Sequence, residues 1–291
     1  MEIVVCVTQV VDLSQPLSVR SGLLATEGGP LHYCLNPADQ GALEQGLRVR
    51  DRLKGARVTV VSLGPRECEP LLRECLSAGA DEALLLSDPD FEGGDTLATA
   101  RVLSRAAQRL RADLVLCGRQ ATDGTTGQTP LQLGELMGAA TVSGVVHLEL
   151  ADGPSEVIVQ RKLERGYRAI LRCPLPAVLA VEPGLATLRY PRLRDRFRTQ
   201  RAPIQRWSRE DLGLSPDEVG ERGSCVQVLD IGPAKPDTRG LFVPESSLSG
   251  MDRWQAVISG GLGGRQSSLV EGPPEMARER LLSFLSDRGL I

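Results

Sequence analysis

The loop at residues 118–129 holds the residues in this chain that are best suited to bind an anion. It reads Gly-Arg-Gln-Ala-Thr-Asp-Gly-Thr-Thr-Gly-Gln-Thr and follows an apolar run at residues 114–117. Its three glycines allow tight turns and a close approach of the backbone to a ligand. Its threonine and glutamine side chains add donors where a helix is predicted to begin, and the free N–H groups of a helix N-terminus attract phosphate. An ordinary strand–loop–helix turn with threonine caps has the same pattern, so the loop alone leaves both interpretations open.

Residues that catalyse reactions or bind metals are sparse. The chain has seven cysteines without a Cys-x-x-Cys pair, and its two histidines, His32 and His147, stand in no metal-ligand pattern. Cys6 and Cys117 fall in strand-like runs, and Cys75 falls on the apolar face of a predicted helix. Such positions are typical of small buried thiols in a reducing compartment. We therefore expect no metal site.

Strand and helix patterns alternate through the first half of the chain and would position the loop. The apolar runs that predict strands lie at residues 2–7, 57–63, 83–86 and 114–117. Helices are predicted to begin at Asn36-Pro37, after Gly64-Pro65, at Asp95 and at the end of the loop itself. This alternation predicts an α/β fold, a doubly wound and mostly parallel sheet with helices on both faces.

The pattern changes after residue 140. Residues 142–150 and 156–160 are predicted strands around a turn, residues 168–182 are further extended chain, and we expect antiparallel edge strands on the same sheet. Residues 208–250 are rich in Ser, Gly, Pro and charge, which predicts an extended arm. The amphipathic helix predicted at 274–288 needs a covering surface, which a partner chain could supply. The predicted domains are therefore a nucleotide-binding α/β domain over 1–206 and a C-terminal arm with a helix that packs on a partner over 207–291.

The composition excludes several classes of partner. The 291 residues are 41% hydrophobic and 24% charged, which is typical of globular proteins. Aromatic residues make up 3%, too few for stacking on single-stranded nucleic acid, and a net charge of −3 gives no general attraction to nucleic acid or membranes. No basic leader and no apolar run of membrane-spanning length is present in the sequence. We therefore expect a cytoplasmic protein with no nucleic-acid partner and no membrane insertion.

Several short motifs occur in the order and spacing of one family. They are Asn36-Pro-Ala-Asp-Gln-Gly-Ala-Leu-Glu44, Ser62-Leu-Gly-Pro65 with Leu76-Ser-Ala-Gly-Ala-Asp81, the loop from Gly118 to Thr129, Leu175-Pro-Ala-Val178, Arg189-Tyr190 with Pro203-Ile204, and a closing Gly263-Gly264 followed by a helix. On these motifs the chain resembles the β subunit of electron transfer flavoproteins (the FixA family) over nearly its whole length.

The resemblance implies a fold, a partner and a cofactor. The fold would be a doubly wound α/β domain of the adenine nucleotide α-hydrolase-like type, with a nucleotide at the carboxyl ends of the strands. The chain would form a heterodimer with a larger α subunit that holds the electron-carrying FAD, and would itself bind AMP or, in electron-bifurcating members, a second FAD. The complex would pass electrons between flavin dehydrogenases and an acceptor. The flavin supplies the chemistry, so the subunit is expected to be an electron carrier and not an enzyme.

Carried over by position, the resemblance places the nucleotide against two strand ends, one helix start and the loop. The residues are Cys6, Asn36, Pro37, Ala38, Asp39, Leu63, Gln120, Ala121, Thr122, Asp123, Gly124, Thr125, Thr126, Gly127, Gln128, Thr129, Pro130 and Leu131. Cys6 and Leu63 would wall an adenine pocket, and residues 125–129 would grip phosphate. Structural roles are open alternatives: core packing for Cys6, helix capping for Asn36, a helix-dipole contact for Asp39 and turn closure for Asp123.

The loop does not decide between AMP and a second FAD. AMP-binding members tend to have a run of acidic residues there, whereas bifurcating members tend to have Asp-Gly-Asp-Thr. Asp123-Gly124 is similar to the second kind, and a less acidic loop repels a diphosphate less, which favours a second FAD. Thr125 stands in place of the second Asp and departs from that pattern.

Leu193 stands where the family docks on dehydrogenases through one leucine. The residues around it differ from the family, because Leu193-Arg-Asp-Arg-Phe197 replaces the usual Leu-Pro-x-Ile-Met. One apolar anchor ringed by charge still suits a transient interface. A solvated charged loop is the alternative for Arg192, Arg194, Arg196 and Arg198.

Two other functions compete with the electron carrier. One is a non-redox scaffold that binds an adenine nucleotide. The other is an ATP-pyrophosphatase-like enzyme, because Ser259-Gly-Gly-Leu-Gly-Gly264 is similar to a pyrophosphate loop. Gly263 stands where that motif needs Asp, and the motif lies too late in the chain to follow the first strand.

Overall fold

The fold is known from a computed structural model that describes most of the chain. It describes residues 1–14, 17–20, 23–26, 31–151, 153, 155–229, 244–258 and 272–287, with side chains described except at 17–20, 23–26, 258 and 287. The chain divides into two units, Met1–Pro233 and Ala234–Ile291. The glycine-rich segment at 259–264, which the pyrophosphatase alternative depends on, lies outside the described residues.

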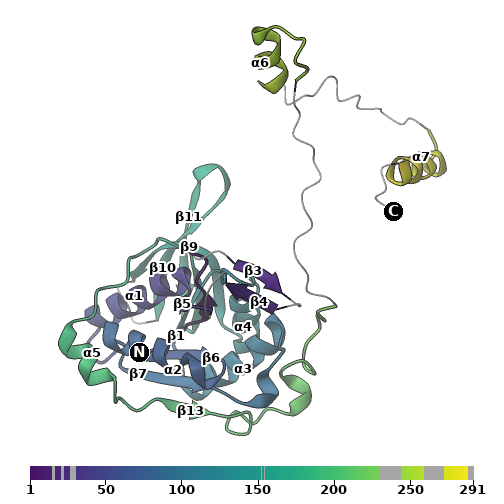
Figure 1. Ribbon diagram of the computed structural model, residues 1–291. Helices are drawn as coiled ribbons and strands as arrows, with labels where there is room; N and C mark the ends of the chain where they lie inside the picture. The colour runs from purple at the N-terminus through teal and green to yellow at the C-terminus, as the bar shows by residue number, and fades with distance from the viewer. Residues whose placement is uncertain are drawn as a thin grey trace. The chain divides into compact units, whose positions relative to one another are not determined.

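A sheet of nine strands in the described part of the chain forms the centre of the first unit, in the order β11-β10-β9-β12-β8-β1-β6-β7-β13 (Figure 1). All pairs from β9 to β13 in that order are parallel, and β10 and β11 extend the β9 edge in antiparallel fashion. The strands are β1 (Glu2–Cys6), β6 (Arg57–Leu63), β7 (Glu82–Leu86), β8 (Leu114–Gly118), β9 (Ala140–Leu150), β10 (Glu156–Lys162), β11 (Arg168–Pro174), β12 (Ala177–Val181) and β13 (Gln205–Trp207). This confirms the predicted mostly parallel α/β fold.

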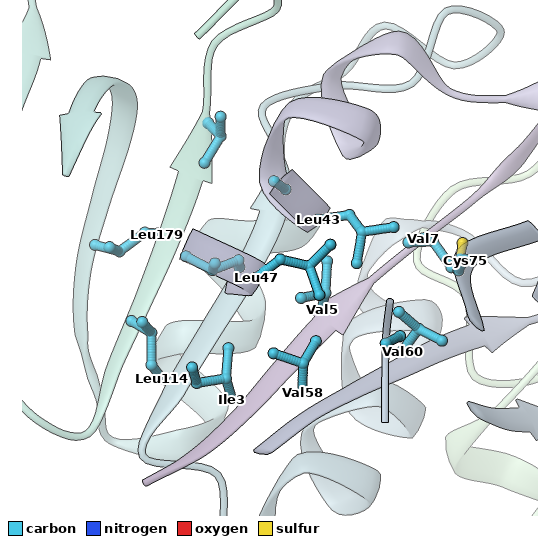
Figure 2. Close-up of a cluster of buried hydrophobic side chains, with 14 of the residues drawn as sticks. Ile3, Val5, Val7, Leu43, Leu47, Val58, Val60, Cys75, Leu114 and Leu179 are labelled. Atoms are coloured by element: carbon cyan, nitrogen blue, oxygen red, sulfur yellow. The ribbon is translucent and has the colours of Figure 1, made fainter. Parts of the chain in front are cut away.

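Helices cover both faces of the parallel part because its strands are apolar on both faces. On one face, β1, β6, β8 and β12 pack against α1 (Pro37–Arg52), and Figure 2 shows Val5 and Ile3 beside Leu47. The helix α2 (Glu69–Ala78) joins this cluster through Leu72 and Cys75. On the other face, Val4 and its neighbours pack against α3 (Thr96–Arg109) and α4 (Thr129–Met137). Such two-sided burial is the reason these strands read as unbroken apolar runs.

One strand lies elsewhere than predicted. β12 belongs to the stretch 168–182 that was expected at an antiparallel edge, but it lies inside the sheet and pairs in parallel with both β8 and β9. Its five residues, Ala-Val-Leu-Ala-Val, are all buried, as a strand covered on both faces requires. The neighbouring β10 and β11 are antiparallel and end the sheet, as predicted.

Two small strand pairs lie between β1 and α1. β2 (Gln9–Val11) pairs with β5 (Tyr33–Leu35), and β3 (Leu17–Arg20) pairs with β4 (Leu23–Thr26), both antiparallel. The β2–β5 pair returns the chain to the end of β1. As a result, α1 begins beside the strand that it follows in the sequence.

The predicted arm begins later than residue 207. β13 pairs with β7 at the sheet edge, and Leu212, Leu214 and Val219 are buried in the core that contains α3. Arg209 also attaches this segment to the first unit, because its Nε donates to Asp90 Oδ2 at 2.7 Å. Residues 212–219, in the stretch predicted to be an extended arm, therefore belong to the core of the first unit, although only three of their apolar side chains enter it.

The remaining helices are short or lie in the second unit. α5 (Leu193–Thr199) belongs to the first unit, whereas α6 (Gly250–Ile258) and α7 (Pro274–Asp287) belong to the second. α7 agrees with the predicted terminal helix, and α6 was not predicted. The short 3-10 turns are η1 (Arg66–Cys68), η2 (Pro89–Phe91), η3 (Glu164–Gly166) and η4 (Pro216–Glu218). Among the described helices, none has the length and hydrophobicity that crossing a bilayer demands.

Candidate functional site

The strand order places a binding edge at the ends of β1 and β8. After β1 the sheet grows to one side through β6 and β7, and β8 then returns to pair with β1 on the other side. At such a reversal the loops that leave the two neighbouring strands diverge and open a crevice at their carboxyl ends. The loop predicted to bind an anion leaves β8 at this point.

The first turn of α1 is bonded to the ends of both strands. Asn36 precedes the helix, and Pro37 suits the first helical position because its fixed φ matches the helix. One carboxylate oxygen of Asp39 accepts the backbone N–H of Thr8, after β1, at 2.8 Å, and the other accepts the N–H of Gly118, at the end of β8, at 2.9 Å. Asp39 is 4% exposed. It is therefore an internal link between the two strands.

Gly118 is needed at this link because no side chain fits there. A Cβ at residue 118 would lie 2.2 Å from Asp39 Oδ1 and 2.7 Å from the Cβ of Ala38. Asn36 adds a third bond, because its Nδ2 donates to the carbonyl oxygen of Gln120 at 3.1 Å. Its Oδ1 is buried without a hydrogen-bond partner among the described residues. The predicted residues Asn36, Ala38 and Asp39 are thus brought together with the start of the loop.

The loop after β8 is held in a strained conformation. Thr125 has φ of +49°, which is unfavourable for a β-branched residue, and its N–H donates to Ala121 O at 3.0 Å. Gly127 also has a positive φ, +63°. Strain of this kind costs of order 1–3 kcal/mol and clusters at ligand sites. Asp123 closes its own turn by accepting the N–H of Gly124 at 2.6 Å, so its predicted structural role is present.

Three consecutive amides of the loop are available to a ligand. The backbone N–H groups of Thr126, Gly127 and Gln128 donate to no other atom in the part of the chain that the structure describes. They lead directly into α4, whose first turn contains Thr129 and Pro130 and carries the positive end of the helix dipole. Thr126 and Gln128 are exposed, and Gly127 between them is half-buried.

The other predicted residues lie at the same edge but farther from the link. Cys6 ends β1 in register with Cys117 of β8, and both thiols are buried. Leu63 ends β6, the strand on the far side of β1 from β8, and is half-buried. Leu131 lies on α4 and is exposed, whereas Pro130 is buried.

Burial is the largest influence on the pKa of the Asp39 carboxyl group. Removal from water raises the pKa of Asp39 to about 7, although the N–H of Thr8, the Asn36 side chain and the N–H of Gly118 oppose this change. The Cys6 thiol, burial and the Asp39 charge raise the pKa of the Cys117 thiol, which stays uncharged. In the described residues no group of three or more His, Cys, Asp or Glu side chains is arranged to hold a metal ion.

The sequence did not reveal which residues support the loop from outside. Thr96, in the first turn of α3, donates through its hydroxyl to Gln128 Oε1 at 3.1 Å. Arg119 binds Glu182, at the end of β12, with 2.8 Å between Nη1 and Oε1. Asp95 caps α3 and also accepts the N–H groups of Cys225 and Val226 at 2.7 and 3.1 Å. Only the capping role of Asp95 had a signal in the sequence.

Two cavities lie away from this edge. One, of about 150 Å³, lies between α1 and β9 and is lined by Arg48, Arg52 and His147 among others. The other, of about 260 Å³, lies between α2 and α5 and is lined by Arg73 and Arg196 among others. Neither includes a residue predicted to bind the nucleotide.

The segment around Leu193 forms a helix with an apolar outer face. Leu193 and Phe197 stand one turn apart on α5 and are 70% and 64% exposed. Arg73 of α2 holds the end of the helix by donating to the carbonyl oxygens of Thr199 and Ala202 at 3.0 and 2.8 Å. Glu44 of α1, 4% exposed, holds the chain before the helix by accepting the N–H and Nε–H of Arg189, each at 3.0 Å.

Residues 30–212 of the chain match the Electron transfer flavoprotein domain. The chain belongs to the electron transfer flavoprotein family. Relatives within this family include proteins named as electron transfer flavoprotein β subunits and as FixA, which confirms the resemblance seen in the motifs. The matched region contains α1, β8 and the whole loop after β8, and it excludes the second unit.

Three relatives illustrate the similarity to this electron transfer flavoprotein chain. It is 38% identical over 231 residues to "Caffeyl-CoA reductase-Etf complex subunit CarD" of Acetobacterium woodii, covering 79% of this chain and 86% of that protein. It is 37% identical over 231 residues to "Electron transfer flavoprotein subunit beta" of Thermoanaerobacterium thermosaccharolyticum, with the same two coverages. It is 34% identical over 255 residues to "Protein FixA" of Azotobacter vinelandii, covering 84% of this chain and 89% of that protein.

Proposed function

We propose that this chain is the β subunit of a heterodimeric electron transfer flavoprotein and that it binds AMP or a second FAD at the ends of β1 and β8. An α subunit would hold the electron-carrying FAD, and the complex would pass electrons between flavin dehydrogenases and an acceptor in the cytoplasm. The chain would act as an electron carrier without catalytic residues, because the flavin supplies the redox chemistry.

The observation that carries the proposal is the row of free amides at residues 126–128. A nucleotide phosphate needs donors that are already oriented, and three successive N–H groups before a helix supply them. The threonine hydroxyls at 125, 126 and 129 stand beside these amides and add further donors. The positive φ of Thr125 supports the same assignment, because strained backbone clusters at ligand sites.

A second FAD is favoured over AMP by the charge of the loop. Asp123 is the one carboxylate between residues 119 and 129, and it is occupied by the N–H of Gly124. Its negative charge is thus partly offset within its own turn, which lowers the repulsion of a diphosphate. The name of the Acetobacterium relative joins a reductase with an Etf complex, and an electron-bifurcating role for this chain is consistent with that relationship.

The test is the nucleotide content of the heterodimer. The chain is purified with its α-type partner, and acid extraction followed by chromatography counts the bound adenine compounds. Two FAD per heterodimer would support the bifurcating form, and one FAD with one AMP would support simple transfer. Absence of any adenine compound from this subunit would overturn the proposal.

A substitution in the loop after β8 tests whether the bound nucleotide occupies that loop. Gly127→Trp should empty the β-subunit site and leave the α-bound flavin in place. Gly138→Trp is the matched control, because Gly138 has nearly the same φ, +62° against +63°, and ends α4 on the side away from the loop. Full nucleotide content in Gly127→Trp would contradict the site.

The outer face of α5 is proposed to dock a flavin dehydrogenase. Leu193 would be the anchor, and Phe197 extends the same exposed face by one turn. Arginines at 192, 194, 196 and 198 surround it and would attract an acidic partner and speed encounter. The second unit is proposed to pack on the α subunit, because α6 and α7 expose Met251, Trp254, Met276 and Leu281.

A further inference from the structure

The cavity of about 150 Å³ between α1 and β9 lies where, among the described strands, the second half of β9 has a neighbour on one edge only. β12 pairs with β9 as far as Val145, whereas β10 covers the other edge of β9 up to Leu150. The register with both neighbours shifts near Val145, and such bulges bend a strand. Residues 146–150 continue past the end of β12 and line the cavity opposite α1.

One polar side chain in the wall of this cavity lacks a partner. Gln45 of α1 is 6% exposed. Its amide makes no hydrogen bond to any residue that the structure describes, yet it is not sealed from water, because it borders the cavity. A buried amide without a partner is costly, so its presence in a cavity wall indicates a site that receives a polar ligand.

Two arginines one turn apart on α1 give the cavity its charge. Arg48 Nε bonds to Glu44 Oε1 at 3.0 Å, so its charge is partly compensated. Arg52 is exposed and forms no ion pair within the described part of the chain. The carboxylate in the lining, on Glu149, is engaged by His147, with 2.8 Å between Oε1 and Nε2. An unpaired guanidinium group thus shares a wall with the buried amide, and both are donors that suit an oxygen anion.

The aliphatic part of the lining sets the kind of anion. Val49, Leu148 and Leu185 belong to the wall, and the first two are buried. An inorganic ion would leave these side chains without an apolar contact, whereas a short hydrocarbon chain would cover them. The volume of about 150 Å³ is below the roughly 300–1,000 Å³ of pockets for drug-sized ligands, so a nucleotide does not fit. A small organic carboxylate matches both the donors and the size.

We propose that this cavity binds a small aliphatic carboxylic acid in its ionised form. The carboxylate would lie among the donors of Gln45, Arg48 and Arg52. The hydrocarbon chain would lie against Val49 and Leu148. The cavity shares no residue with the proposed nucleotide site, so the inference goes beyond the proposed function and does not depend on it.

The first experiment measures butyrate binding to the full chain from the ligand's own signals in saturation-transfer NMR. Butyrate should bind saturably with a Kd on the order of 1 mM, an affinity within reach of so small a ligand. Butyramide has the same shape without the charge, and phosphate has the charge without the chain, so each should bind about tenfold more weakly. Absence of butyrate binding would overturn the proposal, as would equal binding of butyramide or a preference for phosphate.

A substitution on α1 tests whether butyrate occupies the cavity. Arg52→Gln should weaken butyrate binding about tenfold, because it removes the unpaired cation from the wall. Arg66→Gln is the matched control, since Arg66 is an exposed arginine on η1 outside the lining. It should leave the affinity unchanged. Equal affinities for the two variants would overturn the assignment of the ligand to this cavity.

A second substitution separates a binding role of Gln45 from a structural one. Gln45→Leu keeps a similar volume without the amide, so it should weaken butyrate binding about tenfold. It should also raise the midpoint of thermal unfolding of the ligand-free chain, because an unpaired buried amide is removed. A lower midpoint with unchanged affinity would show that Gln45 serves only the fold and would overturn the proposal. If Gln45→Leu does not fold, Arg52→Gln still decides, because Arg52 is exposed.

Discussion

Two buried carboxylates on α1, five positions apart, have opposite acidities. Asp39 contacts only neutral donors, and burial raises its pKa to about 7. At Glu44 burial also raises the pKa, but hydrogen bonds from the Arg189 side chain and backbone and from Arg48 outweigh it, so that the pKa is lowered. Both side chains are 4% exposed. The difference teaches that charged partners keep an almost inaccessible carboxyl group ionised, whereas the neutral donors around Asp39 do not offset its removal from water.

The two residues also hold different kinds of segment. Asp39 joins two strand ends inside the sheet, where its partners are fixed by the parallel register. Glu44 fastens the chain before α5 through an arginine whose side chain is one-third exposed. The first link suits a site whose geometry must not vary, whereas the second holds only the base of a helix whose outer face is open.

The largest predicted effect tests how closely Gly118 packs against Asp39 and Ala38. Gly118→Val should lower the free energy of unfolding by about 3 kcal/mol, because its Cβ would overlap Asp39 Oδ1 and the side chain of Ala38. Urea denaturation measures this. Gly124→Val is the control, since nothing lies within 4 Å of a Cβ there. Equal midpoints for the two variants would mean that α1 does not lie against β8 as closely as described.

The next prediction tests the second link. Glu44→Gln should cost about 2 kcal/mol at pH 7, less than a fully buried pair costs because Arg189 is partly exposed. The lowered pKa of Glu44 means that its stabilisation is present above its ordinary value of 4.5 and is lost as the pH falls below it. The variant and the wild type should therefore converge in acid. Glu135→Gln, at an exposed position on α4, should change stability by less than 0.5 kcal/mol (about the limit for surface changes) at any pH.

The third prediction concerns Asp39, whose contribution to stability should change with pH in the opposite direction to that of Glu44. Because the pKa of Asp39 is raised in the folded state, its contribution to stability is greatest below its ordinary value of 3.8 and declines as the pH rises to about 7. The stability of the wild type relative to Asp39→Asn should fall in that window by up to about 1.4 kcal/mol per pH unit. Thermal unfolding at several pH values measures the slope. A rising slope would mean that the two amides, and not burial, dominate at Asp39.

The smallest effect on stability is expected on α5. Leu193→Ala should leave the free energy of unfolding within about 0.5 kcal/mol of wild type, because the side chain is 70% exposed. Electron delivery from the natural dehydrogenase should slow about tenfold if Leu193 is an interface anchor. Stopped-flow flavin reduction measures the rate, with flavin content as a check. Leu163→Ala, at another exposed leucine, is the control; equal rates for the two variants would remove the docking role of Leu193.

Local signals in the sequence predicted the elements well where a cap or a breaker marks their ends. Asn36-Pro37 and Asp95 place the starts of α1 and α3 within one residue, and Gly79 and Gly138 follow the ends of α2 and α4. Strand order has no such local signal, so the position of β12 inside the sheet was missed. The apolar residues 212–219 were missed because their burial depends on α3, a helix about 100 positions earlier.

The candidate site shows the same limit. The loop at 118–129 could be recognised because its residue types are unusual in themselves. The two hydrogen bonds that Asp39 accepts could not be predicted, because both donors are backbone amides, which carry no sequence signature. One of the donors is 79 positions away. The resemblance named Asp39 as a ligand contact, and the structure places it as a link beneath the edge; whether a nucleotide also reaches it stays a prediction.

The anchorage of Asp95 has a mechanical consequence. One of its oxygens holds the first turn of α3, and the other holds the main chain at Cys225 and Val226, just before the first unit ends. A load applied to the segment after Val226 would reach this carboxylate before the bonds of Ser224 and Gly223 behind it. The next residue, Thr96, is already bonded to Gln128. Tension on the segment after Val226 would therefore be transmitted through the Asp95 and Thr96 side chains to Gln128, in the loop that we propose binds phosphate.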